Sequence, residues 1–210
     1  MSGPAFSDDQ RRDLGVFLGR VVRLDSGALV RLRPSGTEYL TFWTQLPFDV
    51  LAARTVPGTW PDDVTVAAAA LLDATSLAPV GAGGAATLEL PPRCDAAWRG
   101  SLPPERGWQP LDTVPADVVR RLITAGEQAF RAAGSRAAGE ALLDHETLRV
   151  RGEEAGAPET AVPFRLLMAL ARMAFLGEQP VSVAVAGPWL RLTATHGTVY
   201  RRRATALLVH

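Results

Sequence analysis

The sequence contains no lysine and no asparagine, and Ile123 is its only isoleucine. All 22 basic residues are therefore arginine, and 22 acidic residues balance them to a formal net charge of zero. Without lysine the chain can form neither a Walker-type phosphate loop nor a Schiff base. The zero net charge also excludes a strongly basic nucleic-acid-binding protein. Codons for the missing residues are AT-rich, so the composition indicates a GC-rich genome.

Cysteine is almost absent as well. Cys94 is the only one, so no internal disulfide can form, and this is typical of a reducing cytoplasm. Residues 1–10 lack the basic and apolar regions of a secretory signal. The longest apolar run, residues 161–176, contains two arginines and is shorter than the roughly 20 residues that cross a bilayer. We therefore predict a cytoplasmic protein without membrane contact.

The N-terminal part predicts a helix followed by a β-meander. Ser7 and Gln10 have the spacing of a capping box. Apolar residues then recur at helical spacing on one face, with arginines between them: Leu14, Phe17, Leu18, Val21 and Val22. Strands are expected at 28–33, 38–44 and 50–56, with a turn at 34–36.

The rest of the chain predicts a second set of helices and strands. Helices are expected at 64–74, 115–133, 136–144 and 160–177, and strands at 87–90, 147–151, 181–185, 189–193 and 198–203. Prolines keep residues 91–112 irregular, and two tryptophans in that stretch indicate that it is held against a surface.

These elements predict an α+β fold with two lobes, each with apolar helices packed on a short antiparallel β-meander. The predicted domains are an N-terminal α+β lobe at 1–90, a Pro/Trp-rich connector at 91–112, and a C-terminal α+β lobe at 113–210. Residues 30–39 also resemble residues 190–200 if one residue is gapped. An internal duplication is one explanation, and turn chemistry common to hairpins is the other.

No catalytic motif is recognisable, so the catalytic residues are unknown and no cofactor is expected. Residues 81–86 match G-x-G-x-x-A, but a helix precedes them and a strand follows, which is the reverse of a dinucleotide site. His145 lies between Asp144 and Glu146, yet adjacent side chains point in different directions, so no metal site is predicted. Cys94 is interpreted as a small buried apolar residue. Arg93 could instead lower the pKa of its thiol.

Charge is unevenly distributed along the chain. Residues 1–105 contain 9 Arg and 12 acidic residues, whereas residues 106–210 contain 13 Arg and 10 acidic residues. If the last two strands pair, their basic and aromatic side chains could bind a phosphate ligand or a partner. The candidate binding residues are Arg191, Arg201, Arg203, Trp189 and Tyr200. Alternatively, these arginines protect a strand edge or pair with acidic residues of the same chain or a dimer partner.

Arg165 and Arg172 lie seven residues apart, on one face of the apolar helix expected at 160–177. A buried guanidinium needs a carboxylate, so we expect this face to meet acidic residues from another element. A polar pocket lined by the two side chains is the alternative.

Residues 99–122, with the sequence RGSLPPERGWQPLDTVPADVVRRL, and their Ala/Arg-rich flanks resemble uncharacterised proteins from high-GC actinobacteria. The resemblance implies no catalytic role for any residue.

Together these features predict a cytoplasmic protein-interaction or scaffolding protein without enzymatic activity, which pairs with itself as a homodimer or binds another protein. A nucleic-acid or phosphate-ligand binder acting through the C-terminal Arg-rich hairpin is the second hypothesis. The third is a small-molecule enzyme with an inter-lobe pocket that uses Asp144, His145 or Cys94.

Overall fold

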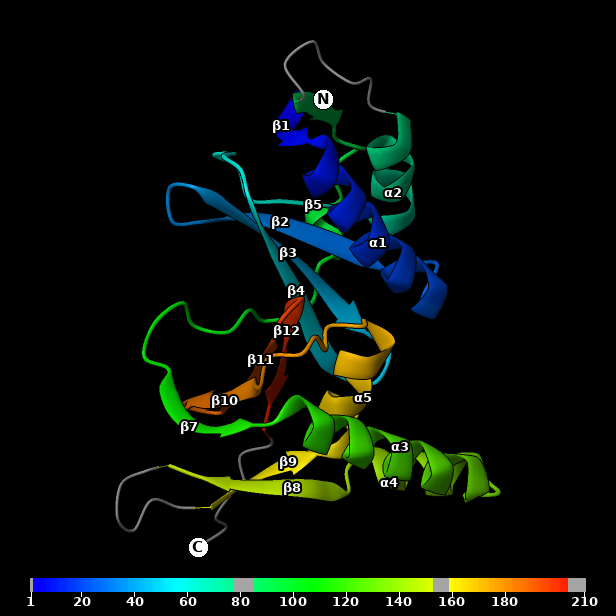
Figure 1. Cartoon of the computed structure of the whole chain (residues 1–210). Coiled ribbons are helices and arrows are strands. Elements are labelled where there is room, and N and C mark those ends of the chain that lie inside the picture. The colour runs from blue at the N-terminus through cyan, green and yellow to red at the C-terminus, as the bar shows by residue number, and fades with distance from the viewer. Residues whose placement is uncertain (1, 78–84, 153–158, 204–210) are drawn as a thin grey trace, which may run out of the picture. The chain divides into compact units, whose positions relative to one another are not determined.

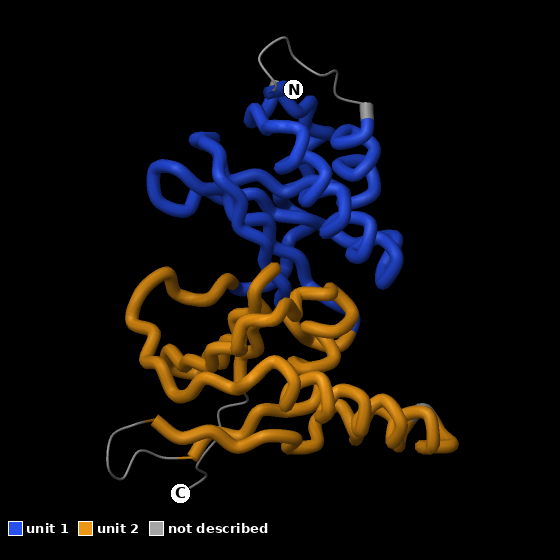
Figure 2. The backbone as a smooth tube through the Cα atoms, in the orientation of Figure 1, with its two compact units in different colours: residues 1–47, 51–101 blue, residues 48–50, 102–210 orange. Residues whose placement is uncertain are grey.

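A computed structural model describes residues 2–77, 85–152 and 159–203 of the chain (Figure 1). This part contains five α-helices and twelve strands, with 34% helix and 39% strand. The predicted α+β class, with helices packed on antiparallel meanders in two lobes, is confirmed. The chain divides into two compact units, coloured separately in Figure 2. Unit 1 comprises residues 1–47 and 51–101, and unit 2 comprises residues 48–50 and 102–210.

The described part of unit 1 contains two α-helices and six strands. In chain order they are β1 (Ser2–Ser7), α1 (Asp8–Leu24), β2 (Leu29–Ser35), β3 (Tyr39–Leu46), β4 (Val50–Pro57), β5 (Val64–Ala67), α2 (Ala68–Leu77) and β6 (Ala85–Glu89). The order of the hydrogen-bonded strands in the main sheet is β5-β2-β3-β4, and β1 pairs with β6 separately. A short 3-10 helix follows at Asp95–Ala97.

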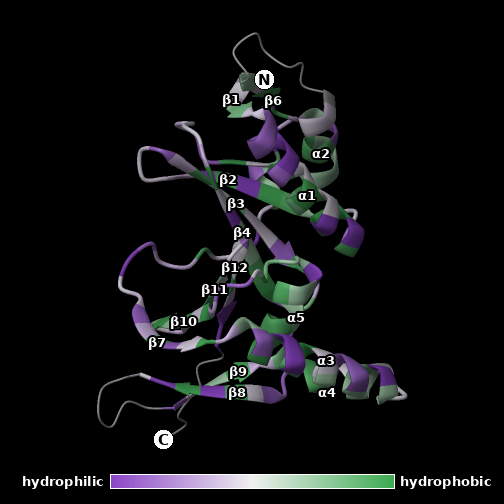
Figure 3. Cartoon of the chain, in the orientation of Figure 1, coloured by the Kyte–Doolittle hydropathy of each residue, from purple (hydrophilic) through white to green (hydrophobic). Residues whose placement is uncertain are grey.

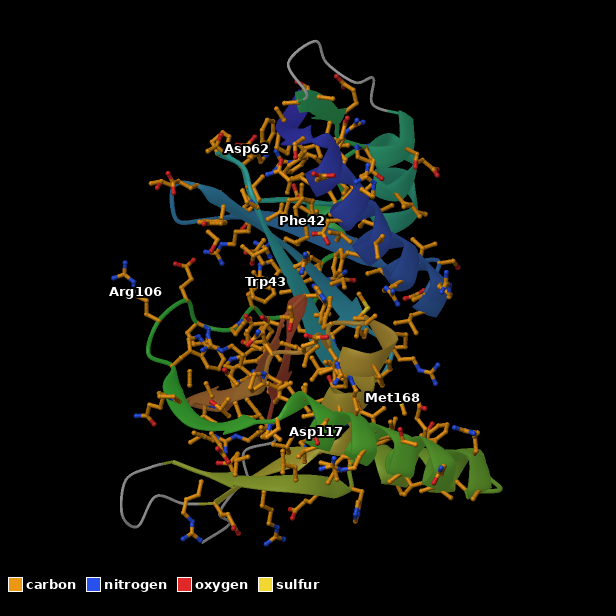
Figure 4. The ribbon with its side chains drawn as sticks, viewed as in Figure 1. Phe42, Trp43, Asp62, Arg106, Asp117 and Met168 are labelled. Carbon is orange, nitrogen blue, oxygen red and sulfur yellow. The ribbon has the colours of Figure 1, made fainter. Side chains whose placement is uncertain are left out.

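Helix α1 begins where the capping box predicts. The Gln10 backbone N–H donates to the Ser7 hydroxyl, and the Gln10 side chain accepts from the Ser7 N–H. This cap fixes the rotation of the helix, so that Leu14 and Leu18 are fully buried. Phe42 of β3, labelled in Figure 4, is buried too, and its ring lies 6.1 Å from the ring of Phe6. The core of unit 1 is therefore a helix face packed on a sheet.

The residues described in unit 2 form three α-helices and six strands. In chain order they are β7 (Gln109–Val114), α3 (Ala116–Ala132), α4 (Arg136–Leu143), β8 (Glu146–Arg151), β9 (Glu159–Pro163), α5 (Phe164–Arg172), β10 (Val181–Ala186), β11 (Trp189–Ala194) and β12 (Gly197–Arg202). The main sheet has the order β12-β11-β10-β7, and β8 pairs with β9 separately. Apolar residues dominate α5, as Figure 3 shows, and every residue from Phe164 to Leu170 is buried.

Two predicted helices are shorter than expected because β-strands precede them. Residues 64–67 form β5, whose Val64 and Val66 pair with β2, rather than the start of a helix. Residues 159–163 form β9, and α5 ends at Arg172 rather than at Gly177, with Ala174 at a positive φ of 47°. A short buried strand and a buried helix segment have the same apolar pattern, which explains both errors.

The predicted connector at 91–112 is irregular except for the 3-10 helix and the start of β7 at Gln109. The boundary between the two units, after residue 101, falls inside it. The predicted division at residues 90 and 112 stays a prediction.

The two ends of the chain share an order of elements. β1-α1-β2-β3-β4 and β9-α5-β10-β11-β12 are each a strand, a helix and a three-stranded meander. The similar sequences at 30–39 and 190–200, however, cover β2–β3 in one meander and β11–β12 in the other. They therefore match the first hairpin of one meander with the second hairpin of the other.

No helix in the described ranges is both long and apolar enough to cross a membrane.

Close packing between α3 and α5 makes Gly126 sensitive to substitution. A Cβ atom at this position would lie 2.1 Å from the ring of Phe164, which is fully buried. We expect Gly126→Ala to lower the free energy of unfolding by about 1–3 kcal/mol, because the core must shift to accept the methyl group. Urea unfolding followed by circular dichroism measures the change.

Gly19→Ala in α1 is the matched control. A Cβ there would meet nothing within 4 Å, so alanine should stabilise the helix by about 0.5–1 kcal/mol. Equal effects from the two substitutions would contradict the packing argument.

Candidate functional site

The C-terminal hairpin selected from the sequence is formed by β11 and β12. Arg191 lies opposite Tyr200, and Leu190 lies opposite Arg201. Opposed residues share a face of a sheet, and the face alternates along each strand. Arg191, Tyr200 and Trp189 therefore lie on one face, whereas Arg201 lies on the other. The structure does not bring these side chains together as one basic ribbon.

On the first face, a tryptophan from the connector covers Arg191. The guanidinium carbon of Arg191 lies 4.3 Å from the centroid of the Trp108 ring, which is within the range of a cation–π interaction. The Trp108 and Tyr200 rings are 5.7 Å apart and tilted by 58°. Burial raises the pKa of Tyr200, and the Arg191 charge opposes that shift. Arg191 thus contributes to packing within the chain.

On the second face, Arg201 joins an ion-pair network in which the arginines are largely buried and the carboxylates are exposed. Its Nη2 atom is 2.9 Å from Oδ1 of Asp144, and its Nε atom is 3.8 Å from Oδ2 of Asp49. Arg165 of α5 lies 2.6 Å from the other Asp144 oxygen and donates to the Phe48 carbonyl at 2.7 Å. Asp144 therefore bridges two guanidinium groups. The expectation that Arg165 finds a carboxylate is confirmed.

The remaining candidates lie apart from this network. Arg203 follows the end of β12 and donates to the Gly187 carbonyl at 2.8 Å. His145 is exposed, and Arg172 is exposed at the end of α5. Residues 81–84 of the glycine-rich motif and His210 lie outside the described residues. Across the ranges that are described, no group of three His, Cys, Asp or Glu residues could hold a metal ion.

Cys94 is held by hydrogen bonds rather than activated. Its Sγ atom lies 3.5 Å from the carbonyl oxygen of Thr65. Burial, followed by the negative charge of Asp95, raises the pKa of the Cys94 thiol. Arg93 does not lower this pKa, since its guanidinium binds Asp95 at 2.9 Å. The thiolate, which is the reactive form, is therefore disfavoured.

A basic stripe that sequence reasoning did not select runs along α1. Arg12, Val16, Arg20 and Arg23 are spaced by four, four and three residues, which places them on one helix face. Val16 is 53% exposed, the highest value among the large apolar residues described. We call these four residues the α1 stripe. It lies opposite the buried face that contains Leu14 and Leu18.

The arginines of the α1 stripe are little constrained by carboxylates. Arg12 lies 2.6 Å from Asp9, but their side chains are 73% and 90% exposed, and such pairs contribute little. Within the described ranges, Arg20 and Arg23 form no ion pair or hydrogen bond. On α3, by contrast, Arg121 pairs with Asp117. In the described part of the chain, Arg20, which is half-buried, and Arg23, which is exposed, thus have no carboxylate partner.

The sequence carried a signal for this stripe. The capping box fixes where the helix begins, and the apolar residues fix its buried face, so the opposite face follows from the helical repeat. The excess of arginine over acidic residues in residues 106–210 favours the C-terminal arginines as the binding site instead.

Two protein-family models match the chain. Residues 5–100 match "Domain of unknown function (DUF8010)", and residues 103–206 match "Domain of unknown function (DUF8185)". The chain carries two domains of unknown function. The predicted resemblance to uncharacterised proteins is confirmed to that extent, and the actinobacterial source stays a prediction. No curated protein matches.

Solved structures reveal a fold similarity that the sequence does not. The β sliding clamp of Caulobacter crescentus is 14% identical, with a TM-score of 0.61 over 99% of this chain and 66% of the clamp chain. The DNA polymerase III β chain of Streptococcus pneumoniae is 12% identical, with a TM-score of 0.62 over 98% and 66%. The Helicobacter pylori β clamp is 13% identical, with a TM-score of 0.61 over 95% and 63%. The chain has a fold similar to that of sliding clamps, and it spans just under two thirds of their length.

This similarity corrects the functional prediction. The interpretation as a non-enzymatic interaction or scaffolding protein is wrong, because the neighbours that share the fold are sliding clamps of DNA polymerases. The binding residues predicted on the hairpin and the small-molecule enzyme alternative stay predictions. In the structure Arg191 lies against Trp108, and Asp144 binds Arg165 and Arg201.

The bridging role of Asp144 predicts a large loss of stability in its absence. We expect Asp144→Ala to lower the free energy of unfolding by about 2–3 kcal/mol, because the buried Arg165 loses its carboxylate. The value lies below the roughly 3–5 kcal/mol of a fully buried pair because Asp144 is 55% exposed. Urea unfolding measures it.

Glu146→Ala is the control for removing a nearby acidic group. Glu146 pairs with Arg149, and both side chains are more than half exposed, so the loss should stay below about 0.5 kcal/mol. A loss from Asp144→Ala no larger than that would contradict the bridging role.

Proposed function

We propose that this protein is a DNA-binding, clamp-like protein. The observation that carries the proposal is the fold similarity to sliding clamps over 95–100% of the chain, found for several clamps at TM-scores of 0.56–0.62. At 12–16% identity this similarity concerns the fold, so the function needs support from the chain's own residues.

The α1 stripe supplies that support. The phosphates of duplex DNA place one negative charge about every 1.7 Å along the helix axis, and arginines that neutralise them provide sequence-independent affinity. Arg12 and Arg23 are eleven residues apart, so the stripe extends about 16 Å along α1. A zero net charge does not prevent such contacts, because screening limits each charge to a distance of roughly 8–10 Å.

We also propose that the protein self-associates, as its fold similarity to sliding clamps suggests. A closed assembly of identical chains has point-group symmetry, and a ring needs head-to-tail contacts. We propose the cytoplasm as the location, consistent with the single, unpaired Cys94.

A clamp-like protein should be held on DNA by topology as well as by charge. We expect the protein, once loaded at low salt on nicked circular DNA, to resist a wash at about 0.5 M salt, because a closed ring cannot leave a circle. Cutting the DNA with a restriction enzyme should release it. Gel filtration of labelled protein with the DNA measures retention before and after cutting.

Equal retention on circular and linear DNA would reject the topological link and leave only surface binding. No binding to either form at low salt would reject the proposed function altogether.

DNA binding should depend on the α1 stripe. We expect the double variant Arg20→Ala/Arg23→Ala to weaken low-salt binding of a fluorescent duplex and to reduce the slope of log K against log salt by roughly 2. Fluorescence anisotropy across a salt series measures both quantities.

Arg99→Ala/Arg106→Ala is the matched control. It removes the same charge from two exposed arginines of the connector; Arg106 is labelled in Figure 4. An equal loss in the two double variants would contradict a role specific to α1.

A further inference from the structure

Strand β5 lies at one end of the unit 1 sheet, so one of its edges has no strand beside it within that sheet. Its other edge pairs with β2, where Thr65 lies opposite Arg31. The backbone N–H and C=O of Thr65 point away from β2, since both bond to residues of the connector. An edge of this kind can accept a strand from another chain.

Three consecutive residues occupy this edge. The Cys94 N–H donates to the Thr65 carbonyl at 2.8 Å, and the Thr65 N–H donates to the Asp95 carboxylate at 2.6 Å. Arg93 donates to the Asp63 carbonyl at 3.1 Å. We call residues 93–95 the edge cap. It satisfies both backbone groups of Thr65, as a paired strand would do, but the 3-10 helix that begins at Asp95 stops any longer pairing.

Charge reinforces the edge cap. The Thr65 N–H, followed by the Arg93 guanidinium, lowers the pKa of Asp95, so its carboxylate is ionised at neutral pH. The positive charge of Arg31 also lowers the pKa of Asp95. Arg31 itself donates two hydrogen bonds to the Asp63 carboxylate, of 2.6 and 2.7 Å. The Arg31 guanidinium also lies 5.9 Å from the Trp98 ring. The cap is thus specified by polar contacts.

Little apolar burial holds the edge cap in place. No residue from 91 to 102 is buried, and Arg93 and Asp95 are each more than 40% exposed at their side chains. Segments with few buried apolar contacts open locally at a small cost in free energy compared with global unfolding. The cap can therefore leave β5 while the core of unit 1 stays folded.

We propose that the edge cap is an autoinhibitory element that controls self-association of this protein through β5. In the closed state residues 93–95 occupy the Thr65 backbone groups. In the open state those groups pair with an extended strand of a second copy of the chain. The inference rests on the proposed clamp-like assembly, which requires contacts between copies, and it identifies where and how one such contact is controlled.

The choice of a second copy as partner follows from the self-association proposed above and from the size of the edge. β5 has only four residues, which is enough for pairing within a larger interface but not for a stable sheet on its own.

The variant Asp95→Ala tests the proposal in the absence of DNA. It removes the acceptor for the Thr65 N–H, so hydrogen exchange of the β5 amides should become about tenfold faster or more. Sedimentation velocity over a concentration series should show stronger self-association than in the unsubstituted protein. Exchange in the β3 segment should not change, which distinguishes local opening from global unfolding.

Asp62→Ala is the matched control. Asp62 is exposed on the segment before β5 and forms no ion pair or hydrogen bond among the described residues (Figure 4). It removes the same charge, so it should change neither exchange nor association. Asp95→Asn keeps an acceptor oxygen for Thr65 and should behave nearly as the unsubstituted chain does. If Asp95→Ala unfolds the protein, Arg93→Ala replaces it as the test. That variant should also show faster hydrogen exchange in β5 and stronger self-association, with smaller effects.

Faster β5 exchange together with stronger association supports the proposal. If hydrogen exchange of the β5 amides does not change, residues 93–95 do not protect β5 and the proposal is wrong. If exchange becomes faster but self-association does not increase, a second copy of the chain is not the partner of β5. Neither result affects the measurements with circular DNA, so failure of this inference and failure of the proposed function can be distinguished.

Discussion

The register of the antiparallel strands is the constraint on which both units depend. A strand places alternate residues on opposite faces, so one face of each meander packs on a helix and the other carries polar and aromatic residues. In unit 1 this buries Leu32 and Phe42 and leaves Arg31 on the outer face. In unit 2 it buries Leu190 and Leu192 and leaves Arg191 on the outer face. Register thus decides which guanidinium groups lie on the outer face, where Arg31 and Arg191 contact tryptophan rings.

The outer faces of the two meanders share a local arrangement. Arg31 lies opposite Trp43 and beside Trp98, and Arg191 lies opposite Tyr200 and beside Trp108. In each unit an arginine lies next to a cross-strand aromatic residue and a connector tryptophan. The aligned segments at 30–39 and 190–200 place Arg31 and Arg191 at the same position. Because those segments occupy different hairpins of their meanders, shared surface chemistry is sufficient to explain the similarity.

Long elements with clear periodicity could be predicted from the sequence, and short apolar ones could not. Helix α1 and the first hairpin follow from the capping box, the helical spacing of Leu14 and Leu18, and the turn before Gly36, whose φ is +68°. Strand β5 was predicted as helix because pairing with β2, a contact distant in sequence, stabilises it.

The placement of Arg191 and Arg201 on opposite faces could be predicted from the residue numbers. When a two-residue turn joins two antiparallel strands, the numbers of two paired residues add to an odd total. Arg191 therefore pairs with an even-numbered residue of β12 and shares its face, whereas Arg201 lies on the other face. The network of Arg201 with Asp144 and Asp49 could not be predicted, since it joins three distant segments.

The absence of lysine gives these contacts a common physical cause. A guanidinium can bind a carboxylate through two hydrogen bonds and stack on an aromatic ring, whereas an ammonium group is a point charge. Arg31 binds Asp63 with two bonds, Arg165 reaches both Asp144 and the Phe48 carbonyl, and Arg191 stacks on Trp108. Arginines used in this way stabilise the fold and are withdrawn from any ligand. Net charge is therefore a poor guide to binding in this chain. Affinity for an anionic polymer depends instead on cations without partners. Among the described residues, Arg20 and Arg23 are two such cations on one face of α1, within the screening length of each other.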